Sequence, residues 1–287
     1  MKKVAYILVV AVIVVTIVVV GTKRQQRTAE LGPVPQLAGR PMVVEVTEDA
    51  ADPMQVLLGD GSIDERIASL QKLDKNLNED QVQKLVSLLA SKDTNDTTNS
   101  LKINVLQRLR DGDGVAPDIA DQLMSIIDNA EHNEEWRVYC VKQLGSMYGD
   151  LSEGDAERIS QSLWQSLKDN NRKVSGAAFV ALSDNINQPG FDKGKIADKA
   201  LELANDSNCE LNVRTRAFRT CAKLSKKDAL PAIREVVKSS DNRALRIVAI
   251  SSIGKLGDAE DRPALEQLAK SSDPHISMVA KSALRKL

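Results

Sequence analysis

Apolar residues recur along most of the chain at helical spacing, and the pattern itself repeats. Three segments begin at 213, 245 and 276, so successive copies are offset by 32 and then 31 residues. Within each segment the apolar residues lie three or four positions apart, as they do on the buried face of a helix. The chain therefore contains a predicted helical repeat, whose helices in this frame we call A-type helices.

The same frame continues toward the N-terminus with looser spacing. Further A-type helices are predicted at 63–70, 101–109, 136–144 and 174–182. A second amphipathic segment lies between consecutive copies, and we call these the B-type helices. They are predicted at 82–89, 119–127, 159–167, 196–203, 230–237 and 265–269. Because so short a two-helix unit buries only part of its apolar surface alone, the units must stack. The predicted fold class is an all-α solenoid of about six and a half two-helix repeats over 62–287.

Helix-start signals agree with these segments. Ser62 with Glu65 and Asn78 with Gln81 have the spacing of capping boxes. Prolines also lie near predicted helix starts, where the missing N–H costs little, at Pro117, Pro231, Pro263 and Pro274.

The N-terminal segment is strongly apolar. Residues 4–21 carry no charge and follow Lys2 and Lys3. At about 1.5 Å per residue, a helix of this length approaches the thickness of a bilayer core. We expect an uncleaved anchor over 1–21 and a single-pass membrane location. A cleaved signal peptide and a buried helix of a soluble protein remain alternatives.

The orientation of such an anchor follows from its short basic tail. A tail of this kind tends to stay in the cytoplasm, which favours a solenoid on the outer, periplasmic or extracellular side. Residues 22–61 contain Pro33, Pro35, Pro41 and Pro53, which exclude a continuous helix. This stretch is predicted to be a juxtamembrane linker.

Composition narrows the possible partners. Aromatic residues make up only 3% of the chain, and 39 basic and 40 acidic residues give a formal charge of −1. There is thus no overall positive charge to attract nucleic acid. We expect no metal or other cofactor, because Cys140, Cys209 and Cys221 lack CxxC spacing and His132 and His275 are far apart.

No catalytic set is evident either. The DGDG run at 111–114 lacks the remaining ligands of a calcium loop, so a turn between helices is expected. Trp136 and Trp164 lie on apolar helix faces, which favours core packing over a role as binding anchors. Cys140 and Cys221 also lie on apolar faces, whereas Cys209 lies in a loop, free or paired with one of them.

The repeats resemble a known family in the runs DNRALRIVA at 241–249, LGD at 256–258 and PAL at 263–265. These are similar to HEAT repeats of the short bacterial type, which also occur in phycobilisome lyases. The resemblance is specific over 205–287, fair over 130–204, and mainly periodic over 62–129. It implies a right-handed solenoid whose B helices line a concave surface.

The resemblance also implies a ladder of arginines early in the A-type helices, which pair with neighbouring loops. Arg137, Arg214 and Arg246 hold that position, with Lys102 as a stand-in, and Ser175 and Ser277 interrupt it. We call the three arginines the arginine ladder. The aligned repeat-core positions are Ala178, Ala217, Ala249, Ala280, Leu224 and Leu256.

The sequence therefore predicts a non-enzymatic, membrane-tethered scaffold that binds a protein or peptide on its concave face. A HEAT-like enzyme such as a chromophore lyase and a purely structural envelope protein remain alternatives. The last predicted A-type helix, which has no B-type helix after it, is expected to cap the stack. Docking or homo-oligomerisation through that helix stays open.

Overall fold

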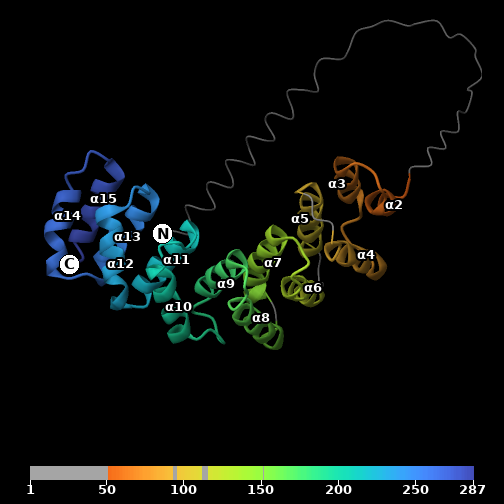
Figure 1. Cartoon of the computed structure of the whole chain (residues 1–287). Coiled ribbons are helices and arrows are strands. Elements are labelled where there is room, and N and C mark those ends of the chain that lie inside the picture. The colour runs from red at the N-terminus through yellow and green to blue at the C-terminus, as the bar shows by residue number, and fades with distance from the viewer. Residues whose placement is uncertain (1–50, 93–95, 112–115, 151) are drawn as a thin grey trace, which may run out of the picture. The chain divides into compact units, whose positions relative to one another are not determined.

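The computed structural model describes residues 51–92, 96–111, 116–150 and 152–287, of which Ala51–Leu287 form one compact unit (Figure 1). All regular elements of these residues are helices, and no strand occurs among them. The predicted all-helical repeat fold is confirmed.

Within the described residues, helices occur at every segment for which the sequence predicts an A-type or B-type helix. The A-type helices are α3 (Ile63–Lys72), α5 (Asp96–Arg110), α7 (Glu134–Met147), α9 (Arg172–Asp184), α11 (Leu211–Lys223), α13 (Arg243–Leu256) and α15 (Pro274–Leu284). The B-type helices are α4 (Glu79–Leu89), α6 (Ala116–Asp128), α8 (Glu153–Ser166), α10 (Lys193–Asn205), α12 (Leu230–Ser239) and α14 (Arg262–Leu268). Short 3₁₀ turns precede α8, α12 and α14 at Tyr148–Asp150, Lys227–Ala229 and Ala259–Asp261.

Local chemistry explains where many of these helices begin. Ser62 and Asn78 form capping boxes with Glu65 and Gln81, as predicted. The side chain of Asn171 accepts from the first backbone N–H groups of α9, and other Asn, Ser and Asp residues cap α7, α8, α10, α13 and α15. Each cap satisfies backbone donors that have no partner within the helix.

One additional helix, α2 (Pro53–Leu58), lies inside the stretch predicted as linker. It packs on α3, so helical packing begins before residue 62. Every B-type helix likewise packs more extensively on the A-type helix that follows it than on the one before. The packing unit is therefore a B-type helix followed by an A-type helix, with α2 in the B-type place. The last A-type helix, α15, packs on α14 and on α13.

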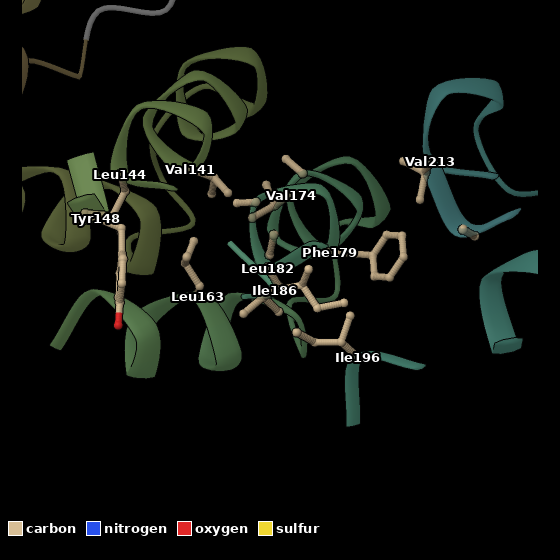
Figure 2. Close-up of a cluster of buried hydrophobic side chains, with 14 of the residues drawn as sticks. Val141, Leu144, Tyr148, Leu163, Val174, Phe179, Leu182, Ile186, Ile196 and Val213 are labelled. Carbon is tan, nitrogen blue, oxygen red and sulfur yellow. The ribbon is translucent and has the colours of Figure 1, made fainter. Parts of the chain in front are cut away.

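The core lies between the two helix types and continues from unit to unit. Leu163 of α8, Leu182 of α9 and Ile186 converge in Figure 2 and are at most 1% exposed. Successive A-type helices from α7 to α15 also contact one another directly. Apolar burial of this kind is the main stabilising contribution to a stack of repeats.

The described residues contain no helix long and apolar enough to cross a bilayer. The longest helix, α5, has 15 residues and is about 22 Å long at 1.5 Å per residue, short of the roughly 30 Å core. This finding overturns the predicted single-pass membrane location, which we withdraw. Residues 4–21, on which that prediction rested, lie outside the described residues, as does most of the predicted linker.

Candidate functional site

The arginine ladder lies at the C-terminal ends of three B-type helices, α6, α10 and α12. All three guanidinium groups donate through Nε to a backbone carbonyl near the C-terminus of the preceding B-type helix. The bonds run from Arg137 to Ile127 (2.9 Å), from Arg214 to Ala204 (3.2 Å) and from Arg246 to Val237 (2.9 Å). Lys102 likewise donates to the carbonyl of Ser91, beyond the end of α4. These carbonyls have no partner within their own helix, so the basic side chains satisfy them.

Two further side chains do the same, and sequence reasoning missed both. Arg66 donates from Nε to the carbonyl of Leu57 (2.8 Å), and Ser277 donates from Oγ to the carbonyl of Ala269 (2.6 Å). Arg66 could have been found, because it lies three residues before the small Ser69, as Arg246 lies three before Ala249. Ser175 instead donates to a carbonyl of its own helix.

The predicted repeat-core residues lie inside the stack. The four alanines, Ala178, Ala217, Ala249 and Ala280, are completely buried, and Leu256 is 1% exposed. Leu224 is half-buried at the end of α11. Small side chains at these places let neighbouring helices approach closely.

Trp136 lies in the core, not on the surface. It is 1% exposed, and its indole Nε1 donates to the carbonyl of Leu89 (3.2 Å). Its ring stacks on Tyr139 with centroids 5.6 Å apart, and the ammonium of Lys102 lies 5.6 Å from its centroid. Trp164 is half-buried on α8. These contacts explain Trp136 as a packing residue that joins α4, α5 and α7.

Reactive side chains are scattered through the structure. All three cysteines are free, Cys140 and Cys221 are buried, and burial raises the pKa of Cys221 to about 12. Burial lowers the pKa of His132, and His275 lies apart on α15 beside Arg243. Groups of three or more side chains that could hold a metal do not occur in the described ranges.

A pocket of about 670 Å³ lies between the consecutive B-type helices α12 and α14, against α13. Its apolar lining comes from Val237, Ile253, Ala264 and Leu268. Its polar lining comes from Arg234, Lys238, Arg246, Glu260, Asp261, Gln267 and Ser271. Apolar walls with a few polar groups are typical of binding sites in proteins.

An ion pair lies at one end of the pocket. Asp261 accepts from Arg234 Nε (2.7 Å) and Nη2 (2.8 Å), and also from the backbone N–H of Asp258 (3.1 Å). The hydrogen bonds from Arg234 lower the pKa of Asp261, against the opposing effect of burial. Both charges are thus matched within the protein and hold α12 and the start of α14 together.

The fold defines a class, the helical repeat proteins, in which successive two-helix units stack side by side. Residues 197–285 match the HEAT repeats family, so the predicted resemblance is confirmed, and the pocket lies within the matched residues.

Two solved helical structures are similar to this chain, and the first supports the fold. The structure of YibA from E. coli is 18% identical and has a TM-score of 0.50, over 89% of this chain and 99% of that one. A computationally designed armadillo repeat protein for modular peptide recognition is 17% identical, with a TM-score of 0.43 over 82% of this chain and 98% of that one. No curated protein matches the chain.

Proposed function

We propose that this protein is an interaction scaffold that binds a protein or peptide segment along the side formed by its B-type helices. The observation that carries the proposal is the pocket between α12 and α14, in the part of the chain that matches HEAT repeats. An extended partner crossing the B-type helices would place a side chain in this pocket. The function is binding, not catalysis.

The finer architecture belongs to the same proposal. The stack is right-handed, holds about six and a half repeats in the HEAT sense, and presents its B-type helices on the concave side. The HEAT resemblance supports this arrangement, because stacks of this family carry their B helices there. A concave row of parallel helices offers a long surface to one extended partner.

The repeat-core residues and the carbonyl bonds of the arginine ladder have structural roles in this proposal. The bonds of Arg137, Arg214 and Arg246 to helix-end carbonyls support that role, as does the burial of Ala249 and its equivalents. The partner would contact the side chains that face the pocket between consecutive B-type helices.

Site-specific photo-crosslinking in the native cells tests the proposal. A photoreactive phenylalanine analogue replaces Gln267, an exposed residue of the pocket, and in a control chain it replaces Lys281, an exposed residue of α15. We expect a crosslinked protein partner at Gln267 and none at Lys281. Equal crosslinking at both positions, or a crosslink only to a second copy of this chain, would contradict binding along the B-type helices.

A further inference from the structure

We propose that the pocket between α12 and α14 selects a peptide segment with an acidic side chain next to an aliphatic one, and that Arg246 binds its carboxylate. This inference rests on the proposed function, since it specifies the chemistry of the partner at the same site. It is carried by a difference between Arg246 and the equivalent arginine three units earlier, Arg137.

Arg137 of α7 is charge-matched within the protein. Its Nη2 donates to the carboxylate of Asp169, and this pair is largely buried, with 5% and 20% of the two side chains exposed. Asp169 lies two residues before Asn171, the residue that caps α9, and it accepts from the backbone N–H of Asn171 (2.8 Å). Because Asp169 neutralises its charge, the buried guanidinium of Arg137 is not available to bind an anionic ligand.

For Arg246 of α13, the residue that corresponds to Asp169 is a serine, Ser271. Ser271 lies two residues before Asp273, the residue that caps α15, and accepts from the N–H of Asp273 (3.2 Å) in the same kind of turn. Ser271 carries no charge. Nε of Arg246 holds the carbonyl of Val237, whereas Nη1 and Nη2 have no hydrogen-bond partner among the described residues. Arg246 is therefore oriented by the fold and keeps two unpaired nitrogens.

The same replacement occurs one unit earlier, at an arginine that does not line this pocket. Ser240 lies two residues before Asn242, the cap of α13, and serves as the equivalent of Asp169 for Arg214. The guanidinium of Arg214 lies over the ring of Phe218, with its carbon 5.5 Å from the centroid. Arg246 lines the pocket described above, which Arg214 does not. Arg214 is thus a matched control for Arg246.

Charges are separated along the pocket. Glu260 and Asp261 lie where α14 begins, and Asp261 is paired there with Arg234 from the first half of α12. The last turn of α12 contributes Lys238, which is exposed, and the bond from Arg246 to Val237 places that arginine at the same end. This end of the pocket carries two basic side chains and no carboxylate from the pocket lining. An anionic group is therefore favoured there by charge complementarity.

The apolar residues of the pocket determine which peptide side chain can lie next to the bound carboxylate. Val237 and Leu268 lie close to the ends of α12 and α14, whereas Ile253 of α13 lies toward the ion pair, next to Gly257 and Asp261. Val237 and Ile253 are only 6% and 2% exposed, so they form the floor of the pocket. An aliphatic side chain next to the acidic one would cover this floor and exclude water from the ion pair.

Selection from a random dodecamer peptide library displayed on phage, with the full chain immobilised, tests this inference. We expect enriched peptides to share an aspartate or glutamate beside Leu, Ile or Val. Enriched peptides without an acidic preference would overturn the proposed role of Arg246 while leaving the scaffold function intact. No enrichment over the immobilisation surface alone would contradict both proposals.

The affinity of one enriched peptide for variants of the full chain then locates the binding site. Arg246→Gln is expected to weaken binding about tenfold, whereas Arg214→Gln, which loses the same kind of carbonyl bond, leaves it unchanged. Lys238→Gln changes only an exposed side chain and is expected to weaken binding about threefold without affecting folding. Replacing the acidic residue of the peptide by its amide should abolish the difference between the wild-type chain and Arg246→Gln. Equal affinities for the wild-type chain, Arg246→Gln and Lys238→Gln would overturn the assignment.

Discussion

Charged side chains close to the core of this protein are matched by neighbours from another helix. Asp261 is 6% exposed and accepts two hydrogen bonds from Arg234, and Arg137 is 5% exposed and pairs with Asp169. A buried charge is costly unless a partner and hydrogen bonds compensate it, so removal of one member destabilises the fold. At the residue scale, these ion pairs join consecutive repeats, and they also compensate the charge of each side chain.

Asp261→Asn is expected to lower the free energy of unfolding at pH 7 by about 1 to 2 kcal/mol, because Arg234 loses its closest carboxylate. Arg234 lowers the pKa of Asp261 in the folded state. The wild-type pair therefore contributes its full stability above about pH 4, the ordinary range of an aspartate, and loses it as the pH falls further. Urea unfolding at pH 7 and pH 3 measures both effects.

The control for this prediction is Asp241→Asn, since Asp241 is exposed. This variant should unfold like the wild-type chain at both pH values. If Asp261→Asn destabilised the protein as much at pH 3 as at pH 7, the ion pair would not be the source of its stability.

At the scale of helices, the two helix types pack differently. A-type helices approach one another closely through small residues, such as Gly254 of α13 against Ala283 of α15. Consecutive B-type helices make fewer contacts with each other, and α12 and α14 leave the pocket between them. The size of the side chains on the A-type helices thus fixes the spacing of the units, and the space between the B-type helices follows from it.

Gly254→Ala is expected to destabilise the fold by about 1 to 2 kcal/mol. An added Cβ would lie 2.7 Å from the Cα of Ala283, so α15 would have to move. This cost exceeds the gain of roughly 1 kcal/mol that alanine has over glycine within a helix. Thermal or urea unfolding measures the change.

Gly154→Ala is the matched control, because a Cβ at this position in α8 would meet nothing within 4 Å. Alanine should leave stability unchanged or raise it there by several tenths of a kcal/mol. Equal effects of the two substitutions would show that helix propensity decides the outcome and not the contact between α13 and α15.

At the scale of the whole described stack, each unit is stabilised by its neighbours, so one weak junction can divide the unfolding reaction. The A-type helices α7 and α9 contact each other extensively, whereas α5 and α7 contact each other sparsely along their backbones. Long side chains bridge that second junction. Lys102 lies over the ring of Trp136, and Arg110 donates to Gln143.

Trp136→Ala is therefore expected to uncouple the first units from the rest. Loss of this buried ring costs about 3 to 5 kcal/mol, and the carbonyl of Leu89 loses its donor. Hydrogen exchange should show that α3, α4 and α5 lose protection while α9 to α15 keep theirs. Trp164→Ala, at a half-buried position, should cost less and leave α3 to α5 protected. Uniform loss of protection in Trp136→Ala would mean that the stack unfolds as one cooperative unit.

The sequence alone determined the helices from α3 onward and their two types, because amphipathic spacing and cap chemistry are local. The run at 245–256 lies within α13, and the capping residues Ser62 and Asn78 precede the helices that they predict. It also placed Arg246 at the position where the HEAT resemblance implies a repeated arginine. The membrane location predicted from the sequence was wrong.

Only the tertiary structure decided which helix packs on which, that α2 takes a B-type place, and that Ser277 covers a carbonyl as the arginines do. It alone brought Lys238, Ile253 and Leu268 together with Arg246 in one pocket. The physical reason is distance along the chain. A pocket forms from side chains of three helices, and whether they meet depends on interhelix spacing set by packing, which no local pattern of residues encodes.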